Sequence, residues 1–190
     1  MSVSHFDWPA AWRWAASLEA VPAGPCSQQV QAILDTASGT APREWQTPAV
    51  PPTAPLRLSD WLHLTPGALL QEVRLRLSET PQDPGEYAAV VLPGCAFAAC
   101  RAADLPLAAA LLELMVHWNL KLLAAGELAD YLAFQQRPEG SCGYLNPLRP
   151  TPFAPGEALM AYHLPVTHAI TGALSAYAHW RGHSPVEVST

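Results

Sequence analysis

The chain has few basic residues, and this scarcity argues against a nucleic-acid-binding surface. Lys121 is the single lysine, and ten Lys and Arg residues face sixteen Asp and Glu residues, which gives a formal net charge of −6. Binding to a phosphate backbone requires clustered positive side chains, whereas the arginines are scattered along this chain. We therefore expect no nucleic-acid partner.

Cysteine is also scarce, and its spacing does not suggest a metal site. The four cysteines contain no CxxC pair; they are Cys26, Cys95, Cys100 and Cys142. Structural zinc sites typically draw their ligands from closely spaced pairs. We expect reduced, partly buried thiols, and we expect neither a bound metal nor a cofactor.

No long hydrophobic run is present. The longest apolar stretch, Leu105 to Val116, is interrupted by Glu113 and is too short to span a bilayer. The segment from Met1 to Trp14 lacks the basic region followed by an apolar run that a secretory signal would show. These observations predict no membrane contact and a cytoplasmic location.

Ala and Leu supply most of the apolar half of the chain, and both residues favour helices. Proline disrupts a helix interior, so the twenty prolines are expected between the helices. A length of 190 residues suits one domain. The composition therefore predicts a single all-α domain over residues 1–190, with short helices joined by Pro-rich loops, and an internal linker or loop at residues 40–55.

Capping residues and apolar periodicity locate the helices. Asp7 with Pro9, and Asp104 with Pro106, are typical helix starts, and Ser27 is a third candidate cap. Residues 86–99 remain ambiguous between helix and strand. The predicted helices cover residues 8–20, 27–37, 65–78, 104–123, 127–136, 156–163 and 165–181.

Two segments in the C-terminal half carry a family resemblance. They are Gln136-Arg-Pro-Glu-Gly-Ser-Cys-Gly-Tyr144 and Val166-Thr-His-Ala-Ile-Thr-Gly-Ala-Leu-Ser175. Residues 105–182 resemble the helical-hairpin repeats of the terpenoid cyclase and protein prenyltransferase α/α toroid. The resemblance implies stacked antiparallel helical hairpins, as a partial α/α toroid-like fold or a helical bundle, in which Gln136 holds a turn and takes no part in chemistry.

The chain departs from that family at the residues that carry its chemistry. The aspartates are isolated, so the Asp-rich acid motif of the cyclases is absent. His168 stands where the prenyltransferases have a zinc-binding histidine, but the matching Asp and Cys are missing. A lone histidine does not hold zinc, which takes three or four protein ligands. The resemblance thus implies a relative without the family's catalytic activity.

The last predicted helix carries a polar face opposite its apolar stripe. At about 100° per residue, that face holds His168, Ser175 and His179, with Thr171 at its edge. It either lines a ligand-binding cavity or is an ordinary solvated face. In the preceding loop, Gly140 to Tyr144 is either a binding loop, with Cys142 and Tyr144 as contact residues, or a turn that needs glycine.

Three functions remain open. The first is a non-catalytic helical protein that recognises a protein partner, a second copy of itself or a small apolar ligand. The second is an enzyme acting on an apolar, isoprenoid-like or natural-product substrate, with His168 and Cys142 in its site; Cys142 would act as nucleophile only if His168 came within hydrogen-bond reach. In the third, the Trp-rich N-terminal segment docks onto a larger assembly.

Overall fold

Helices packed against one another make up the computed structural model of the chain, which describes residues 5–18, 25–39, 88–120, 123–143 and 159–182. Within these ranges the protein is all-α, with six α-helices and no strand, so the predicted fold class is confirmed. The helices are α1 (Trp8–Ser17), α2 (Pro25–Ala37), α5 (Ala88–Ala102), α6 (Leu105–His117), α7 (Leu123–Ala133) and α8 (Leu164–Trp180), the last continuing a π-helical turn, η1 (Leu159–His163).

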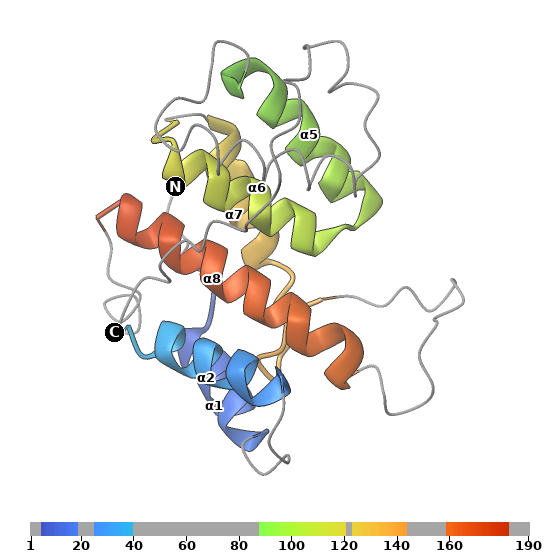
Figure 1. Cartoon of the computed structure of the whole chain (residues 1–190), viewed down its shortest axis with the longest axis vertical. Coiled ribbons are helices and arrows are strands. Elements are labelled where there is room, and N and C mark those ends of the chain that lie inside the picture. The colour runs from blue at the N-terminus through green and yellow to red at the C-terminus, as the bar shows by residue number, and fades with distance from the viewer. Residues whose placement is uncertain (1–4, 19–24, 40–87, 121–122, 144–158, 183–190) are drawn as a thin grey trace.

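Helix α8 occupies the centre of the molecule. Figure 1 shows α1 and α2 on one side of it and α5, α6 and α7 on the other. Both α6 and α2 pack directly on α8, and neighbouring pairs in the chain, α1 with α2, α5 with α6 and α6 with α7, also pack together. Because helices cover α8 from two sides, even polar positions on it are buried, among them Thr167 and Thr171.

The start of α1 follows its local sequence. The Asp7 carboxylate caps the helix by accepting a hydrogen bond from the Ala10 amide at 2.8 Å. Trp8 and Trp14 are buried, whereas Trp12 is 45% exposed. At about 100° per residue, Trp12 lies about 40° beyond Trp8 and falls just outside the buried arc of the helix.

Helix α2 begins before the predicted cap. It starts at Pro25, which places Ser27 inside the first turn and not at the N-cap. Proline suits a first helical position because an N–H at that position would have no partner within the helix, so its absence costs nothing. The predicted end is confirmed: Ala37 closes the helix, and Gly39 follows with a φ of +74°.

The ambiguous segment 86–99 is helical wherever the structure describes it. Residues 88–102 form α5, with Pro93 inside the helix. Taken by itself, the apolar run is compatible with a strand, and the Pro93–Gly94 pair is compatible with a break in a helix. Burial of Leu92, Ala96 and Ala99 against the rest of the core gives this segment the three- to four-residue periodicity of a packed helix.

The boundary between α6 and α7 differs from the predicted one, which lay between residues 123 and 127. Asp104 caps α6 as predicted, but the helix ends at His117, and Asn119 follows with a φ of +53°. Gly126, which precedes the predicted start of the second helix at residue 127, lies inside α7. An ideal Cβ at Gly126 would stand 3.3 Å from the Tyr177 hydroxyl, so the small residue permits close packing of α7 on α8.

Several predictions fall outside the described residues: the linker at 40–55, the helix at 65–78, residues 156–158 of the next-to-last helix, and Tyr144. The extent of a single domain over 1–190 stays a prediction for the same reason. Of the helices that the structure describes, none combines the length and apolar character needed to cross a membrane.

Candidate functional site

A tight turn at residues 136–143, called here the 136–143 turn, lies between α7 and the last helix. Its two ends meet in an isolated antiparallel bridge between Gln136 and Cys142. Gly140 and Gly143 have φ values of +101° and +105°, a region that glycine enters without steric cost. The prediction of a turn that needs glycine is confirmed at both positions.

The Gln136 side chain fastens this turn to the first helix. Its Oε1 accepts a hydrogen bond from the Asp7 amide at 2.7 Å, and its Nε2 donates to the Asp7 carbonyl oxygen at 2.8 Å. The same Nε2 lies 3.4 Å from the Gly140 carbonyl oxygen. Both polar atoms of the amide are therefore used in holding the backbone, as expected for a residue that secures a turn.

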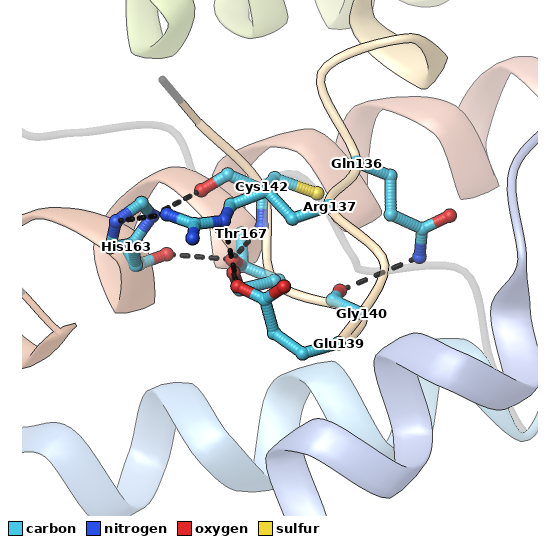
Figure 2. Close-up of polar contacts among 8 residues, drawn as sticks. Gln136, Arg137, Glu139, Gly140, Cys142, His163 and Thr167 are labelled. Atoms are coloured by element: carbon cyan, nitrogen blue, oxygen red, sulfur yellow. Dashed lines mark hydrogen bonds and ion pairs between the residues drawn. The ribbon is translucent and has the colours of Figure 1, made fainter. Parts of the chain in front are cut away.

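Thr167, near the start of α8, secures the other side of the turn. Its hydroxyl donates to the His163 carbonyl oxygen at 2.6 Å and accepts from the Cys142 amide at 2.8 Å (Figure 2). Thr167 is fully buried. A buried hydroxyl without hydrogen-bond partners would cost free energy, but this one both donates and accepts. The contact therefore fixes the turn on α8.

His163 contacts the turn through both ring nitrogens. Nδ1 lies 2.9 Å from the Cys142 carbonyl oxygen, and Nε2 lies 3.2 Å from Nη1 of Arg137. Figure 2 shows the Arg137 guanidinium between the His163 imidazole and the Glu139 carboxylate. The ring of Tyr162 packs edge-on against His163, with 5.1 Å between ring centroids.

Glu139 completes the network at its exposed side. Its Oε1 accepts from Arg137 Nε at 2.7 Å and from the Ser141 hydroxyl at 3.0 Å. Slight burial acts to raise the pKa of Glu139, but the backbone and Ser141 hydrogen bonds, together with the charges of Arg137 and His163, hold that pKa below its ordinary value. The carboxylate is therefore ionised at neutral pH, and its Oε1 already accepts hydrogen bonds from Arg137 and Ser141.

The Cys142 thiol is not poised for nucleophilic attack. The residue is fully buried, and burial raises the pKa of the thiol far above its ordinary value, although the hydrogen bond with Thr167 partly opposes this. Only the thiolate is an effective nucleophile. The ring next to Cys142 is that of His163, which contacts the Cys142 carbonyl oxygen.

The predicted polar face of the last helix is divided by burial. Thr171 and Ser175 are 0% and 4% exposed, whereas His168 is half-buried and His179 is exposed. The Thr171 hydroxyl donates to the Thr167 carbonyl oxygen at 2.8 Å. An ordinary solvated face is therefore the wrong interpretation for Thr171 and Ser175, because neighbouring helices cover both sides of α8.

Three members of this network were not among the site residues predicted from the sequence: His163, Thr167 and Arg137. Thr167 and His163 are four residues apart across the start of α8, which places them on adjacent turns of one face. That spacing was a usable signal for this pair. Arg137 carried no such signal, because its contact with His163 spans 26 positions of sequence.

Within the described residues, no group of three or more His, Cys, Asp or Glu side chains is arranged to hold a metal ion. Three thiols have described side chains, and Cys95, Cys100 and Cys142 are not in disulfide bonds. Neither a family model, nor a curated protein, nor a solved structure matches this chain. Any assignment of function must therefore come from the geometry.

Proposed function

We propose that the protein acts by binding a protein partner through apolar side chains on its surface, and that it does not act as a catalyst. The observation that carries this proposal is the exposure of aromatic residues beside the first helix. Trp12 is 45% exposed and Phe134 is 68% exposed. Trp and Phe are enriched at the centres of protein interfaces, where Trp is a frequent source of binding energy.

The two aromatic residues lie in one region of the fold. His5 stacks on Phe134, with 5.3 Å between ring centroids, and Gln136 holds Asp7, the residue that caps α1. At about 1.5 Å of rise per residue, Trp12 is about 8 Å along α1 from Asp7. A standard interface of about 800 Å² per partner is wide enough to include both aromatic side chains.

The polar side chains around the 136–143 turn are engaged in structural hydrogen bonds or buried, which supports binding over catalysis. The Thr167 hydroxyl and both ring nitrogens of His163 hold the backbone or a neighbouring side chain, and the Cys142 thiol is buried. A nucleophile or general base needs an accessible group of suitable pKa. Catalysis on an apolar substrate with His168 and Cys142 stays an untested prediction.

Kinship of residues 105–182 with α/α-toroid hairpins is also part of the proposal. Two features support it: Gln136 secures a turn after α7, and Thr167 stands near the start of the helix that follows. Helical hairpins of this kind would serve here as a scaffold for the surface next to α1.

The test is native mass spectrometry of the protein purified from its own host, with the variants Trp12→Ser, Phe134→Ser and Arg13→Gln. We expect the wild-type chain to carry a second polypeptide, which includes a second copy of itself. Each aromatic variant should weaken that complex about tenfold or more, as loss of an interface anchor does. Arg13 is exposed next to Trp12, so Arg13→Gln serves as the matched control and should retain the partner.

Two results would contradict the proposal. One is a wild-type chain that carries a small molecule or nothing at all. The other is a partner that both aromatic variants retain with unchanged affinity. A retained small apolar molecule would support the ligand-binding alternative. Loss of an enzymatic activity in a His168→Ala, Cys142→Ala double variant would support the catalytic one.

A further inference from the structure

Two of the large apolar side chains that the described part of the chain exposes belong to α5 and α7. Phe97 of α5 is 65% exposed, and Leu123 of α7 is 74% exposed. Single exposed apolar residues are common on monomeric proteins, whereas a shared patch marks an interaction surface. The relative positions of these two residues therefore decide whether they form one surface.

The line along which α5 meets α7 runs through Cys100 and Tyr131. The Tyr131 hydroxyl donates a hydrogen bond to the Cys100 carbonyl oxygen at 3.1 Å. At about 100° per residue, Phe97 lies about 60° around α5 from Cys100. The buried Ala96 lies about 40° from Cys100 in the opposite direction. Phe97 is therefore next to α7, on the side of α5 that faces away from the core.

The exposed residues of α7 continue this outer side. Glu127 and Leu123 lie about 40° and about 80° around the helix from Tyr131. The buried Leu128 lies about 60° from Tyr131 in the opposite direction. Both helices pack on α6, so their outer sides point the same way. We call the resulting surface the α5–α7 face; its residues are Phe97, Arg101, Leu123 and Glu127.

The α5–α7 face carries one exposed charge of each sign. Arg101 of α5 is exposed and places its guanidinium carbon 5.9 Å from the centre of the Phe97 ring. Glu127 is exposed on α7. Neither charged side chain forms an ion pair with another described residue. The cation therefore stands with an aromatic ring on one helix, and the carboxylate stands with a leucine on the neighbouring helix.

We propose that the α5–α7 face binds a second copy of the chain about a two-fold axis. A two-fold interface presents the same patch twice, so it requires a patch that is complementary to itself. This face meets that requirement when α5 of one copy lies on α7 of the other. Arg101 then pairs with Glu127 of the partner subunit. Phe97 packs on Leu123 of the partner subunit, and the axis repeats both contacts.

The size of the α5–α7 face indicates a weak dimer. Helix α5 has 15 residues and α7 has 11, which gives lengths of about 22 Å and about 16 Å. Two such helices side by side, about 10 Å apart, offer less surface than a standard interface of about 800 Å² per partner. We therefore expect a reversible dimer, with the monomer predominant in dilute protein. This contact is separate from the surface at Trp12 and Phe134 and does not depend on the proposed function.

Sedimentation equilibrium of the full chain, from about 10 to about 500 µM, tests for this dimer. We expect the wild-type protein to shift from monomer towards dimer across this range. Arg101→Glu and Glu127→Arg should each weaken the dimer about tenfold or more, because each variant opposes like charges twice in one interface. Arg13→Glu makes the same charge reversal at an exposed position of α1 and should leave the dimer unchanged.

An equal mixture of the two charge-reversal variants gives the decisive result. In a mixed dimer both pairs again join opposite charges, so the mixture should associate with nearly wild-type affinity. Misfolded chains would not show this rescue. Phe97→Ser should also weaken the dimer about tenfold, because it removes an apolar contact from the interface, while circular dichroism shows unchanged helix content.

Several results would overturn the proposal. One is a wild-type chain that stays monomeric at every concentration, as when another protein or another segment of this chain covers the face. Others are a dimer that the charge reversals leave intact and a mixture that does not reassociate. Trp12→Ser should keep the dimer; its loss in this variant would place self-association beside α1 and would also overturn the α5–α7 contact.

Discussion

At Gly140 two separate constraints act on one residue. The backbone φ is +101°, and a Cβ atom built there would collide with the carbonyl group of Ala10 in α1. A side chain would therefore be strained by its own backbone and would also push the first helix away. At Gly182 the φ is +75°, and nothing lies within 4 Å of the added Cβ, so the strain occurs there without the collision.

These two glycines give a matched prediction. Gly182→Ala should lower the free energy of unfolding by about 1 to 2 kcal/mol, the cost of the left-handed region for an L-residue. Gly140→Ala should cost about 3 kcal/mol or more, because the collision with backbone atoms adds to that strain. Urea unfolding followed by circular dichroism would measure both. Equal losses in the two variants would show that α1 does not approach the turn as closely as described.

At the scale of the element, α6 shows how local sequence fixes a helix start. Asp104 is the N-cap, and its Oδ1 accepts a hydrogen bond from the Leu107 amide at 3.2 Å. This bond satisfies one of the amides that an α-helix leaves without a partner in its first turn. The end of the same helix depends on tertiary contacts: the Trp180 indole of α8 donates to Asn119 Oδ1 at 2.8 Å, just past the helix.

Asp104→Ala should therefore destabilise the protein by about 1 kcal/mol, the usual value of a lost N-cap. The control is Glu127→Ala at an exposed position of α7, which should change stability by less than about 0.5 kcal/mol. Thermal or urea unfolding of the pair would measure the difference. A loss in Asp104→Ala no larger than that of the control would contradict the assignment of the cap.

At the scale of the whole molecule, α1 connects two hydrophobic clusters. Trp8 and Ala11 belong to the large cluster shared by α5, α6, α7 and α8. Trp14 and Ala15 belong to a smaller one with α2 and Leu164. The N-terminal segment is thus part of the core, while Trp12 alone among its tryptophans is exposed.

Deletion of residues 1–20 should abolish cooperative unfolding. Replacing one buried Trp by Ala costs about 3 to 5 kcal/mol, and loss of both Trp8 and Trp14 approaches the whole stability of a typical domain, about 5 to 15 kcal/mol. Circular dichroism during urea unfolding would detect the loss. Trp12→Ser should keep a cooperative transition. A deletion variant that unfolds cooperatively would instead support an N-terminal docking arm.

Sequence alone determined the features that depend on near neighbours in the chain. Ala and Leu content predicted the helices, Asp7 and Asp104 predicted two helix starts, and a turn that needs glycine was one of the two interpretations of the Gly140–Tyr144 segment. Each rests on backbone dihedral preferences or on hydrogen bonds within a few residues, so no knowledge of the distant chain was needed.

Only the tertiary structure decided which side chains are buried and which polar groups meet. Thr171 and Ser175 lie inside because α8 is covered on two sides, and Trp12 lies outside because the buried arc of α1 ends before it. The contact between Arg137 and His163 joins residues 26 positions apart, and that between Gln136 and Asp7 joins residues 129 apart. Such pairs depend on how whole helices pack, which periodicity and capping within one segment cannot specify.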